Sequence, residues 1–140
     1  MNFKPHELEY MNNADLGRLA TMQRSGTLQA SPVGFTFNSE LGTIDIYGYH
    51  MSASQKYRNI AANPKVAFVV DDIASRQPWR VRCLEIRGTA EQATVAGGTG
   101  PAGDAVDTAI IRITPTRIIS FGIDDLDTEP HQLTADSRDV

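Results

Sequence analysis

The chain has 140 residues, of which 41% are hydrophobic and 21% charged, with a net charge of −4. This composition favours one soluble domain with a hydrophobic core of its own. The acidic balance excludes a broad basic surface for duplex nucleic acid, and no apolar run is long enough to cross a bilayer. The single cysteine, Cys83, excludes a disulfide framework and a Cys-rich zinc site. The N-terminal residues lack the apolar stretch of a signal peptide, so we expect a cytoplasmic protein.

The first part of the chain predicts one short helix and three strands. Residues 5–13 favour a helix that starts at a proline. Alternating apolar and polar residues predict a half-buried strand over 16–22. A glycine-containing turn at 24–27 joins it to a second strand over 28–38, so the pair forms a hairpin. Residues 43–49 are rich in β-formers and predict the third strand.

A second helix and two longer strands follow. Residues 52–63 predict a helix with apolar side chains on one face, and Pro64 ends it. Residues 65–72 are almost continuously apolar, which is typical of a strand buried on both faces. Residues 79–93 alternate and predict a long strand, in which Gly88 indicates a bulge or a bend.

The last part predicts a loop, one more strand or strand pair, and a tail. The glycine-rich residues 94–103 predict a flexible loop. Residues 109–113 and 118–123 predict either one strand or a pair separated by a proline. We divide the chain into a barrel domain, residues 1–123, and an acidic C-terminal tail, residues 124–140. The tail is expected to form a mobile arm or to pack on a partner chain.

The order of these elements predicts an all-β fold with short helices. One helix lies within a run of strands joined by short turns, and such hairpins close into a Greek-key barrel. A doubly wound parallel sheet would need a helix after nearly every strand, and the sequence does not supply them.

The strongest candidate for a ligand site follows the third strand. Ser52 or Ser54 can cap a helix, whose first turn presents free backbone N–H groups and the positive end of the helix dipole. Lys56 and Arg58 add positive charge beside that end. The pattern predicts a phosphate or carboxylate site. A capped surface helix with solvated charges is the alternative.

The strand segment from Gln29 to Gly34 is the second candidate. Pro32 lacks an N–H and therefore suits a strand edge rather than a fully paired position. Gly34 lets a flat ring or another backbone approach closely. A planar cofactor lying against a strand would need this combination. The pattern alone favours the alternative, an edge strand or a bulge without a ligand.

Three further side chains are weaker candidates. Trp79 and Arg80 can stack on a planar ring or bind a carboxylate, or Trp79 can pack in the core or at a subunit interface. His50 lies at the strand-to-helix junction, where it can bind a ligand, donate a proton or make a structural hydrogen bond. His6, His50 and His131 show no spacing typical of a metal site.

Two groups are interpreted as structural. Cys83 falls within a predicted strand and is expected to be packed rather than nucleophilic. Asp71 and Asp72 follow an apolar strand, and we interpret them as a solvated turn rather than an acid–base pair.

Seven segments of the chain stand in the order and spacing of a known family. They are Gly17–Thr21, Gln29–Phe35, Ser54–Ile60, Asn63–Asp72, Pro78–Arg80, Glu85–Glu91 and Ile110–Pro115. Together they resemble the pyridoxamine 5'-phosphate oxidase-like split-barrel superfamily, and within it the branch of probable coenzyme F-420-dependent oxidoreductases. The resemblance covers roughly residues 10–123. It depends on the order of the segments, since no single motif is specific.

The resemblance implies a six-stranded antiparallel split barrel that forms a homodimer with cofactor sites between the subunits. Lys56, with Ser54 and Gln55, would face the cofactor phosphate, and the strand from Gln29 would line the ring system. Trp79 and Arg80 would lie near the groove, reaching it from the second subunit. The predicted cofactor-binding residues are Gln29, Ser31, Pro32, Val33, Gly34, His50, Ser52, Ser54, Gln55, Lys56, Trp79 and Arg80.

The resemblance also implies reduction chemistry, with hydride passing from a reduced deazaflavin, coenzyme F-420, to an unsaturated small molecule. FMN on the same fold and a binding protein without turnover are the alternatives. True pyridoxamine-phosphate oxidases carry additional C-terminal substrate-binding residues, so we do not expect that oxidation here. A dimer is also expected on physical grounds, because two subunits bury exposed strand faces and a planar ligand better than one. We expect neither nucleic acid nor membrane as a partner.

Overall fold

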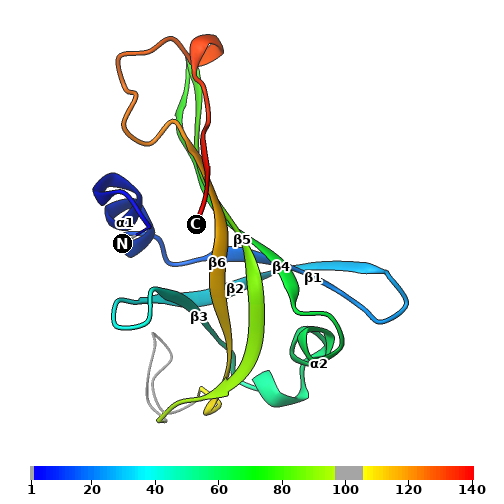
Figure 1. Ribbon diagram of the computed structural model, residues 1–140. Coiled ribbons are helices and arrows are strands. Elements are labelled where there is room, and N and C mark those ends of the chain that lie inside the picture. The colour runs from blue at the N-terminus through cyan, green and yellow to red at the C-terminus, as the bar shows by residue number, and fades with distance from the viewer. Residues whose placement is uncertain (1, 97–105) are drawn as a thin grey trace.

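The computed structural model describes residues 2–96 and 106–140, so most of the predicted glycine-rich loop lies outside the described residues (Figure 1). None of the described helices is long and apolar enough to cross a membrane. Among the described residues, short 3₁₀ turns at Met51–Ala53 and Pro130–Gln132 accompany the main elements. These are α1 (Pro5–Asn12), β1 (Gly17–Met22), β2 (Leu28–Asn38), β3 (Thr43–Tyr47), α2 (Gln55–Ala62), β4 (Lys65–Arg76), β5 (Trp79–Thr94), β6 (Ala109–Phe121) and β7 (Asp136–Asp139).

The strands form one antiparallel sheet that closes into a split barrel. Their order is β3-β2-β1-β4-β5-β6-β7, and β3 also pairs with β6. In Figure 1, β4, β5 and β6 run upright and cross β1, β2 and β3. The closing contact pairs Ile44 with Ile113 and Ile46 with Ile111. The predicted fold class is confirmed, and β7 adds one strand to the six that were expected.

The core fills the space between the crossing strands. Phe35 and Phe68 meet edge to face with ring centroids 5.0 Å apart. Gly17 lies directly under Phe68, since a Cβ on it would stand 2.2 Å from the ring. Full burial of one large aliphatic side chain contributes about 1.5–3 kcal/mol. The fully buried aliphatic side chains include Leu19, Ile44, Ile46, Leu84, Ile86, Ile110, Ile111, Ile113 and Ile118.

The long β5–β6 ladder bends at Gly88, as the sequence predicts. The register shifts between Arg87 and Gly88, and Gly88 pairs with Pro115. A Cβ at Gly88 would lie 2.3 Å from the carbonyl oxygen of Thr114, so only glycine permits this approach. Because the pairing continues on both sides of Pro115, β6 is one bent strand rather than a strand pair.

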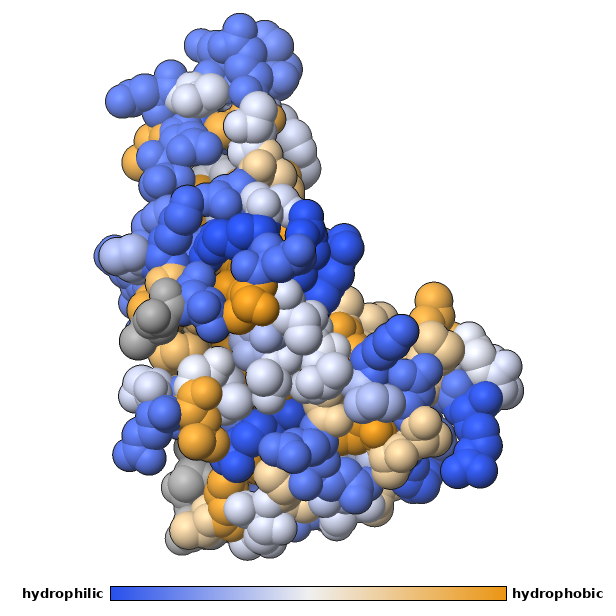
Figure 2. Space-filling model, in the orientation of Figure 1, coloured by the Kyte–Doolittle hydropathy of each residue, from blue (hydrophilic) through white to orange (hydrophobic). Residues whose placement is uncertain are grey.

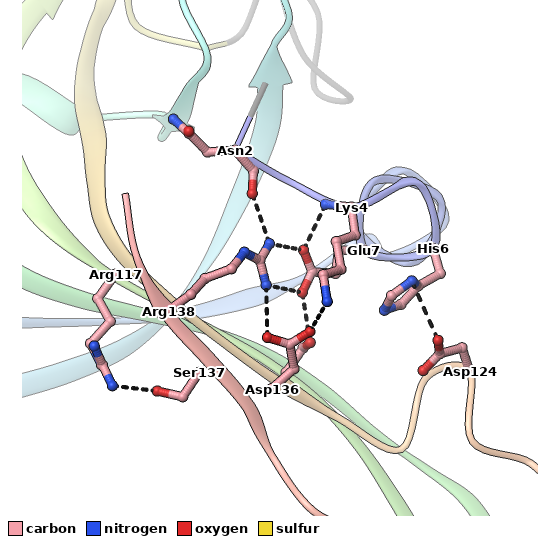
Figure 3. Close-up of polar contacts among 10 residues, drawn as sticks. Asn2, Lys4, His6, Glu7, Arg117, Asp124, Asp136, Ser137 and Arg138 are labelled. Atoms are coloured by element: carbon pink, nitrogen blue, oxygen red, sulfur yellow. Dashed lines mark hydrogen bonds and ion pairs between the residues drawn. The ribbon is translucent and has the colours of Figure 1, made fainter.

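The C-terminal residues do not form the expected mobile arm throughout. Residues 136–139 return to pair with residues 117–120 of β6 as β7. Figure 3 shows the contact that secures them. The Arg138 guanidinium donates to the Glu7 carboxylate of α1, with Nη1–Oε2 at 3.1 Å and Nη2–Oε1 at 2.5 Å. Ser120 Oγ donates to the same carboxylate at 2.6 Å. We call Glu7, Ser120 and Arg138 the terminal clasp.

Candidate functional site

The start of α2 carries the cap that the sequence predicts. Ser54 Oγ accepts a hydrogen bond from the Tyr57 N–H at 3.3 Å and donates to the Met51 carbonyl at 2.7 Å. This cap fixes where the helix begins. It leaves the backbone N–H groups of Gln55 and Lys56 without acceptors inside the helix, as in the first turn of any α-helix. These N–H groups and the helix dipole favour an anion at this end.

Lys56 places a cation at the same end of α2. Its side chain is half-buried. Within residues 2–96 and 106–140, no hydrogen bond or ion pair engages its ammonium group. An ammonium group without a carboxylate partner can bind an anion without first breaking an internal ion pair.

Ser52 already binds a carboxylate of the same chain, that of Asp107. Its backbone N–H and its hydroxyl both donate to Asp107 Oδ2, at 3.0 and 2.7 Å. These hydrogen bonds hold the pKa of Asp107 below its usual value. The turn before α2 therefore binds a carboxylate, and an external anion at Ser52 would have to displace it.

A chain of hydrogen bonds ties α2 to β1 and β2. The Arg58 guanidinium donates to Gln55 Oε1 at 2.9 Å, and Gln55 Nε2 donates to Asn59 Oδ1 at 2.7 Å. The buried Asn59 donates in turn to Thr21 Oγ1 and to Gln29 Oε1, both at 3.0 Å. The structure thus brings together Gln29 and Gln55, two predicted site residues that are far apart in the sequence.

Asn59 is a site residue that the sequence analysis did not single out. A signal for it was present: Asn59 stands four residues after Gln55, so the two side chains share one face of the predicted helix and can form a hydrogen bond. A polar residue in such a position is buried only when its hydrogen bonds are satisfied.

The β2 segment divides the predicted ring-binding residues between two faces. Val33 is buried in the core, and Ser31 and Gln29 share its face because side chains alternate along a strand. Pro32 and Gly34 point the other way. Among the described strands, residues 28–33 pair with β1 only, so Pro32 lies at a singly paired position. Among the described residues, a Cβ on Gly34 would meet no atom within 4 Å, so open space lies above it there.

The remaining predicted site residues lie elsewhere. Trp79 is 55% exposed at the β4–β5 turn, and Arg80 Nη2 donates to the Thr128 carbonyl at 2.6 Å. In Figure 1 this hairpin and α2 occupy opposite ends of the molecule. One chain therefore does not bring Trp79 and Arg80 to Lys56. His50 is exposed just before the 3₁₀ turn, where its carbonyl accepts from the Ala53 N–H at 3.1 Å.

A comparison with known protein families identifies the family of this chain. Residues 3–120 match the family described as pyridoxamine 5'-phosphate oxidase. The chain belongs to this family. The family match spans α1, the barrel strands up to β6, and the capped start of α2, so it covers the region that holds Lys56 and Gly34.

Relatives within and around the pyridoxamine 5'-phosphate oxidase family include named reductases. The chain is 44% identical over 132 residues to the 5a,11a-dehydrotetracycline/5a,11a-dehydrooxytetracycline reductase of Streptomyces rimosus, covering 94% of this chain and 92% of that protein. It is 30% identical to a solved F420 reductase, with a TM-score of 0.58 and coverage of 79% and 93%. The fold is also shared with the conserved hypothetical protein Rv2991 from Mycobacterium tuberculosis, at 19% identity, a TM-score of 0.72 and coverage of 92% and 90%.

A second polar cluster of this family member lies in a cavity of about 470 Å³ beside α1. Tyr10 Oη donates to Asp72 Oδ1 at 2.6 Å, and the Arg82 guanidinium donates to both Asp72 oxygens, at 2.8 and 2.5 Å. Arg82 also lies 5.1 Å from the centre of the Tyr10 ring. Burial and the Asp72 carboxylate raise the pKa of Tyr10, while the hydrogen bonds from Arg82 lower that of Asp72.

The interpretation of Asp71 and Asp72 as a solvated turn is wrong. The β4 strand continues to Arg76, and Asp72 pairs with Arg82 inside the β4–β5 ladder. Cys83 is half-buried in β5, and burial raises the pKa of its thiol to about 11, so the thiol stays protonated at neutral pH.

Proposed function

We propose that this protein is an oxidoreductase that transfers a hydride from reduced coenzyme F-420, a deazaflavin, to an unsaturated small molecule. Two of its relatives support this proposal. The reductase from Streptomyces rimosus is similar along nearly the whole of both chains, and the F420 reductase is 30% identical. Because the first relative is named for dehydrotetracyclines, a polycyclic ketone with a conjugated carbon–carbon double bond is the first substrate class to assay.

The observation that carries the proposal is Lys56, a half-buried residue at the capped start of α2. Its lack of a partner among the described residues fits an acidic cofactor group, which the adjacent N–H groups would also bind. Open space above Gly34 fits a flat ring, since a Cβ there meets no atom of residues 2–96 and 106–140 within 4 Å. The residues present therefore fit a phosphate-bearing planar cofactor.

The chain supplies binding and orientation. Lys56 and the start of α2 would neutralise the acidic group, and the Gln55–Asn59–Gln29 hydrogen bonds hold α2 in place against β1 and β2. When bound, the reduced deazaflavin supplies the hydride. The rigid strand under Gly34 would fix the ring plane, so that the substrate above it is held in a reactive orientation.

We also propose that the protein is a cytoplasmic homodimer. Figure 2 shows an inward corner between the upright arm of the molecule and a shorter arm on the right, which Figure 1 identifies as the β1–β2 hairpin. Both arms carry exposed apolar side chains: Leu28 is 74% exposed on the hairpin and Trp79 is 55% exposed on the upright arm. A second copy seated in the corner would cover such surfaces and would bring Trp79 and Arg80 to the other copy's α2.

A binding experiment tests the cofactor assignment. Coenzyme F-420 is titrated into the purified protein by its own fluorescence, alongside FMN. Replacement of Lys56 by alanine is expected to weaken F-420 binding by about tenfold or more, because a charged hydrogen bond to the anion is lost. Lys65→Ala removes an exposed lysine at the start of β4 and is expected to bind as the wild type does. Equal affinity of Lys56→Ala and wild type contradicts the assignment.

Turnover is tested separately. Reduced F-420 is mixed with the protein and a panel of unsaturated ketones, and its reoxidation is followed by absorbance. Substrate-dependent reoxidation supports the reductase. Tight F-420 binding without reoxidation on any member of the panel would indicate a binding protein, and a yellow protein that prefers FMN would overturn the choice of cofactor.

A further inference from the structure

The side-chain hydrogen bonds that run from α2 to β2 have a fixed direction. We call Arg58, Gln55, Asn59 and Gln29 the hydrogen-bond relay. The Arg58 guanidinium can only donate, so the Gln55 amide turns its oxygen towards Arg58, at 2.9 Å, and its nitrogen towards Asn59 Oδ1, at 2.7 Å. Asn59 then donates with Nδ2, which lies 3.0 Å from Gln29 Oε1. Turning over any one of these amides would set two donors or two acceptors against each other.

The relay fixes the orientation of the Gln29 amide. Because its oxygen accepts from Asn59, its nitrogen, Nε2, is left to face a ligand with N–H donors. Within residues 2–96 and 106–140, Nε2 has no hydrogen-bond acceptor. Over the same residues no buried side-chain nitrogen or oxygen lacks a hydrogen-bond partner, so Nε2 of the half-buried Gln29 reaches the surface. Gln29 therefore presents an open donor whose direction is set before a ligand binds.

This open donor belongs to the same part of the molecule as Lys56. Lys56 precedes Asn59 by three residues, so the two side chains are neighbours on the surface of α2. Gln29 contacts Asn59 from the side of β2. Among the described strands, the other edge of β2 is unpaired over residues 28–33, which leaves room for a ligand along it. A negatively charged group between α2 and β2 can thus accept from Gln29 and from Lys56 together.

We propose that Gln29 Nε2 donates a hydrogen bond to the acidic group that Lys56 binds, and that Asn59 is the positioning residue that keeps the Gln29 amide turned for it. This inference rests on the proposed function, because it adds a contact to the phosphate of the proposed cofactor. Ionised phosphate oxygens accept hydrogen bonds, so an amide turned the other way would repel them. The relay therefore favours a phosphate-bearing form of the flat ring over the same ring without a phosphate.

A pair of ligands tests the donor. They are coenzyme F-420 and the same deazaflavin with a ribityl chain that carries no phosphate, each titrated by its own fluorescence; FMN and riboflavin replace them if the protein prefers FMN. Gln29→Met nearly keeps the length of the side chain and removes the donor. It is expected to weaken binding of the phosphate-bearing ligand by about tenfold or more, because a hydrogen bond to a charged group is lost. Binding of the phosphate-free ligand should stay within about twofold of the wild type.

Gln92→Met is the matched control for the packing of α2. Gln92 Nε2 donates to the Tyr57 carbonyl at 3.0 Å, so it also ties α2 to the barrel, but from β5. This variant should bind the phosphate-bearing ligand as the wild type does. Equal losses for Gln29→Met and Gln92→Met, or equal losses of the two ligands in Gln29→Met, would overturn the inference, because the relay would then only hold α2 in place.

A double-mutant cycle tests the positioning role of Asn59. Asn59→Ser removes the amide that turns Gln29 and is expected to weaken binding of the phosphate-bearing ligand nearly as much as Gln29→Met. Added to Gln29→Met, it should cost little further affinity, because both changes act through one hydrogen bond. Additive losses would overturn the positioning role. If Asn59→Ser does not fold, Arg58→Met gives the same cycle from the exposed end of the relay, since the direct effect of its charge is present in both backgrounds.

The outcomes for Gln29 and Lys56 separate this inference from the proposed function. Wild-type affinity of Lys56→Ala for F-420 contradicts the cofactor site itself. Weak binding by Lys56→Ala together with wild-type binding by Gln29→Met leaves the proposed function in place and overturns the inference.

Discussion

At the scale of single residues, the terminal clasp holds the most deeply buried charge described above. The Glu7 side chain is fully buried, while that of Arg138 is 24% exposed. Loss of one partner of a buried pair leaves an uncompensated charge and costs about 3–5 kcal/mol. We expect Arg138→Met to lower the free energy of unfolding, measured by urea denaturation, by about 3 kcal/mol. Arg117→Met breaks the exposed pair with Asp139 and should cost about 0–1 kcal/mol. Equal losses would contradict this account.

The same pair predicts a pH dependence of stability. Burial disfavours the Glu7 carboxylate, but the hydrogen bonds from Arg138 and Ser120 outweigh it, so the pKa lies below the ordinary 4.5. The stabilisation is therefore complete above pH 4.5 and is lost as the pH falls through the lowered pKa. In Arg138→Met, burial without the guanidinium raises the pKa of Glu7. The difference in the free energy of unfolding between wild type and Arg138→Met should therefore be smaller at pH 4 than at pH 7. An equal difference at the two pH values would contradict a role for the charge of Glu7.

At the scale of strands, the β5–β6 bend and the open position on β2 give a matched pair of glycines. Gly88→Ala forces a carbon against the Thr114 carbonyl, and overpacking of this kind costs about 1–3 kcal/mol. The Cβ of Gly34→Ala meets no atom of the described chain within 4 Å, so this variant should stay within about 0.5 kcal/mol of the wild type. Thermal unfolding followed by circular dichroism compares the two. Gly34→Ala should weaken F-420 binding although its fold stays intact. Unchanged binding would contradict the placement of the cofactor ring on the Gly34 face of β2.

Local pattern predicts the strands that carry their own signal. Alternation and turn residues predict residues 28–38 as one strand, which β2 matches, and Gly88 marks the bend. β7 could not be predicted in this way, because Asp136–Asp139 is a short polar run without β-formers. It is a strand because it pairs with β6 and because Arg138 reaches Glu7, far away in the sequence. β4 likewise extends beyond its apolar run because β5 continues to pair with it.

In the candidate site, too, some features depend on neighbouring residues and others on contacts between distant parts of the chain. The cap at Ser54 depends on neighbouring residues and is readable from the sequence. The bond from Asn59 to Gln29 joins residues 30 positions apart, and it exists because α2 packs against β1 and β2. Periodicity places Asn59 on a helix but does not say which strand it meets. The separation of Trp79 from Lys56 is also a property of the whole barrel, because it follows from how far the β4–β5 hairpin extends.

At the scale of the whole molecule, the exposed arms predict self-association. Sedimentation velocity at micromolar concentration is expected to show a dimer. Leu28→Glu on the β1–β2 arm should shift it towards monomer, because a charge would be buried against apolar surface. Leu41→Glu, at the 58% exposed Leu41 in the β2–β3 turn, is the control and should leave the dimer intact. A monomeric wild type would contradict the homodimer that is part of the proposed function.

The terminal clasp also makes the two ends of the polypeptide dependent on each other. Arg138 donates to the Asn2 carbonyl at 2.7 Å as well as to Glu7, and Figure 1 shows the termini near each other. Fraying of the first helix would therefore release the last strand, and hydrogen exchange should report a single opening event for both. A peptide linker between Val140 and Asn2 would close the chain into a ring, and the exposed turn at Ser25 and Gly26 would then offer a place to cut new ends.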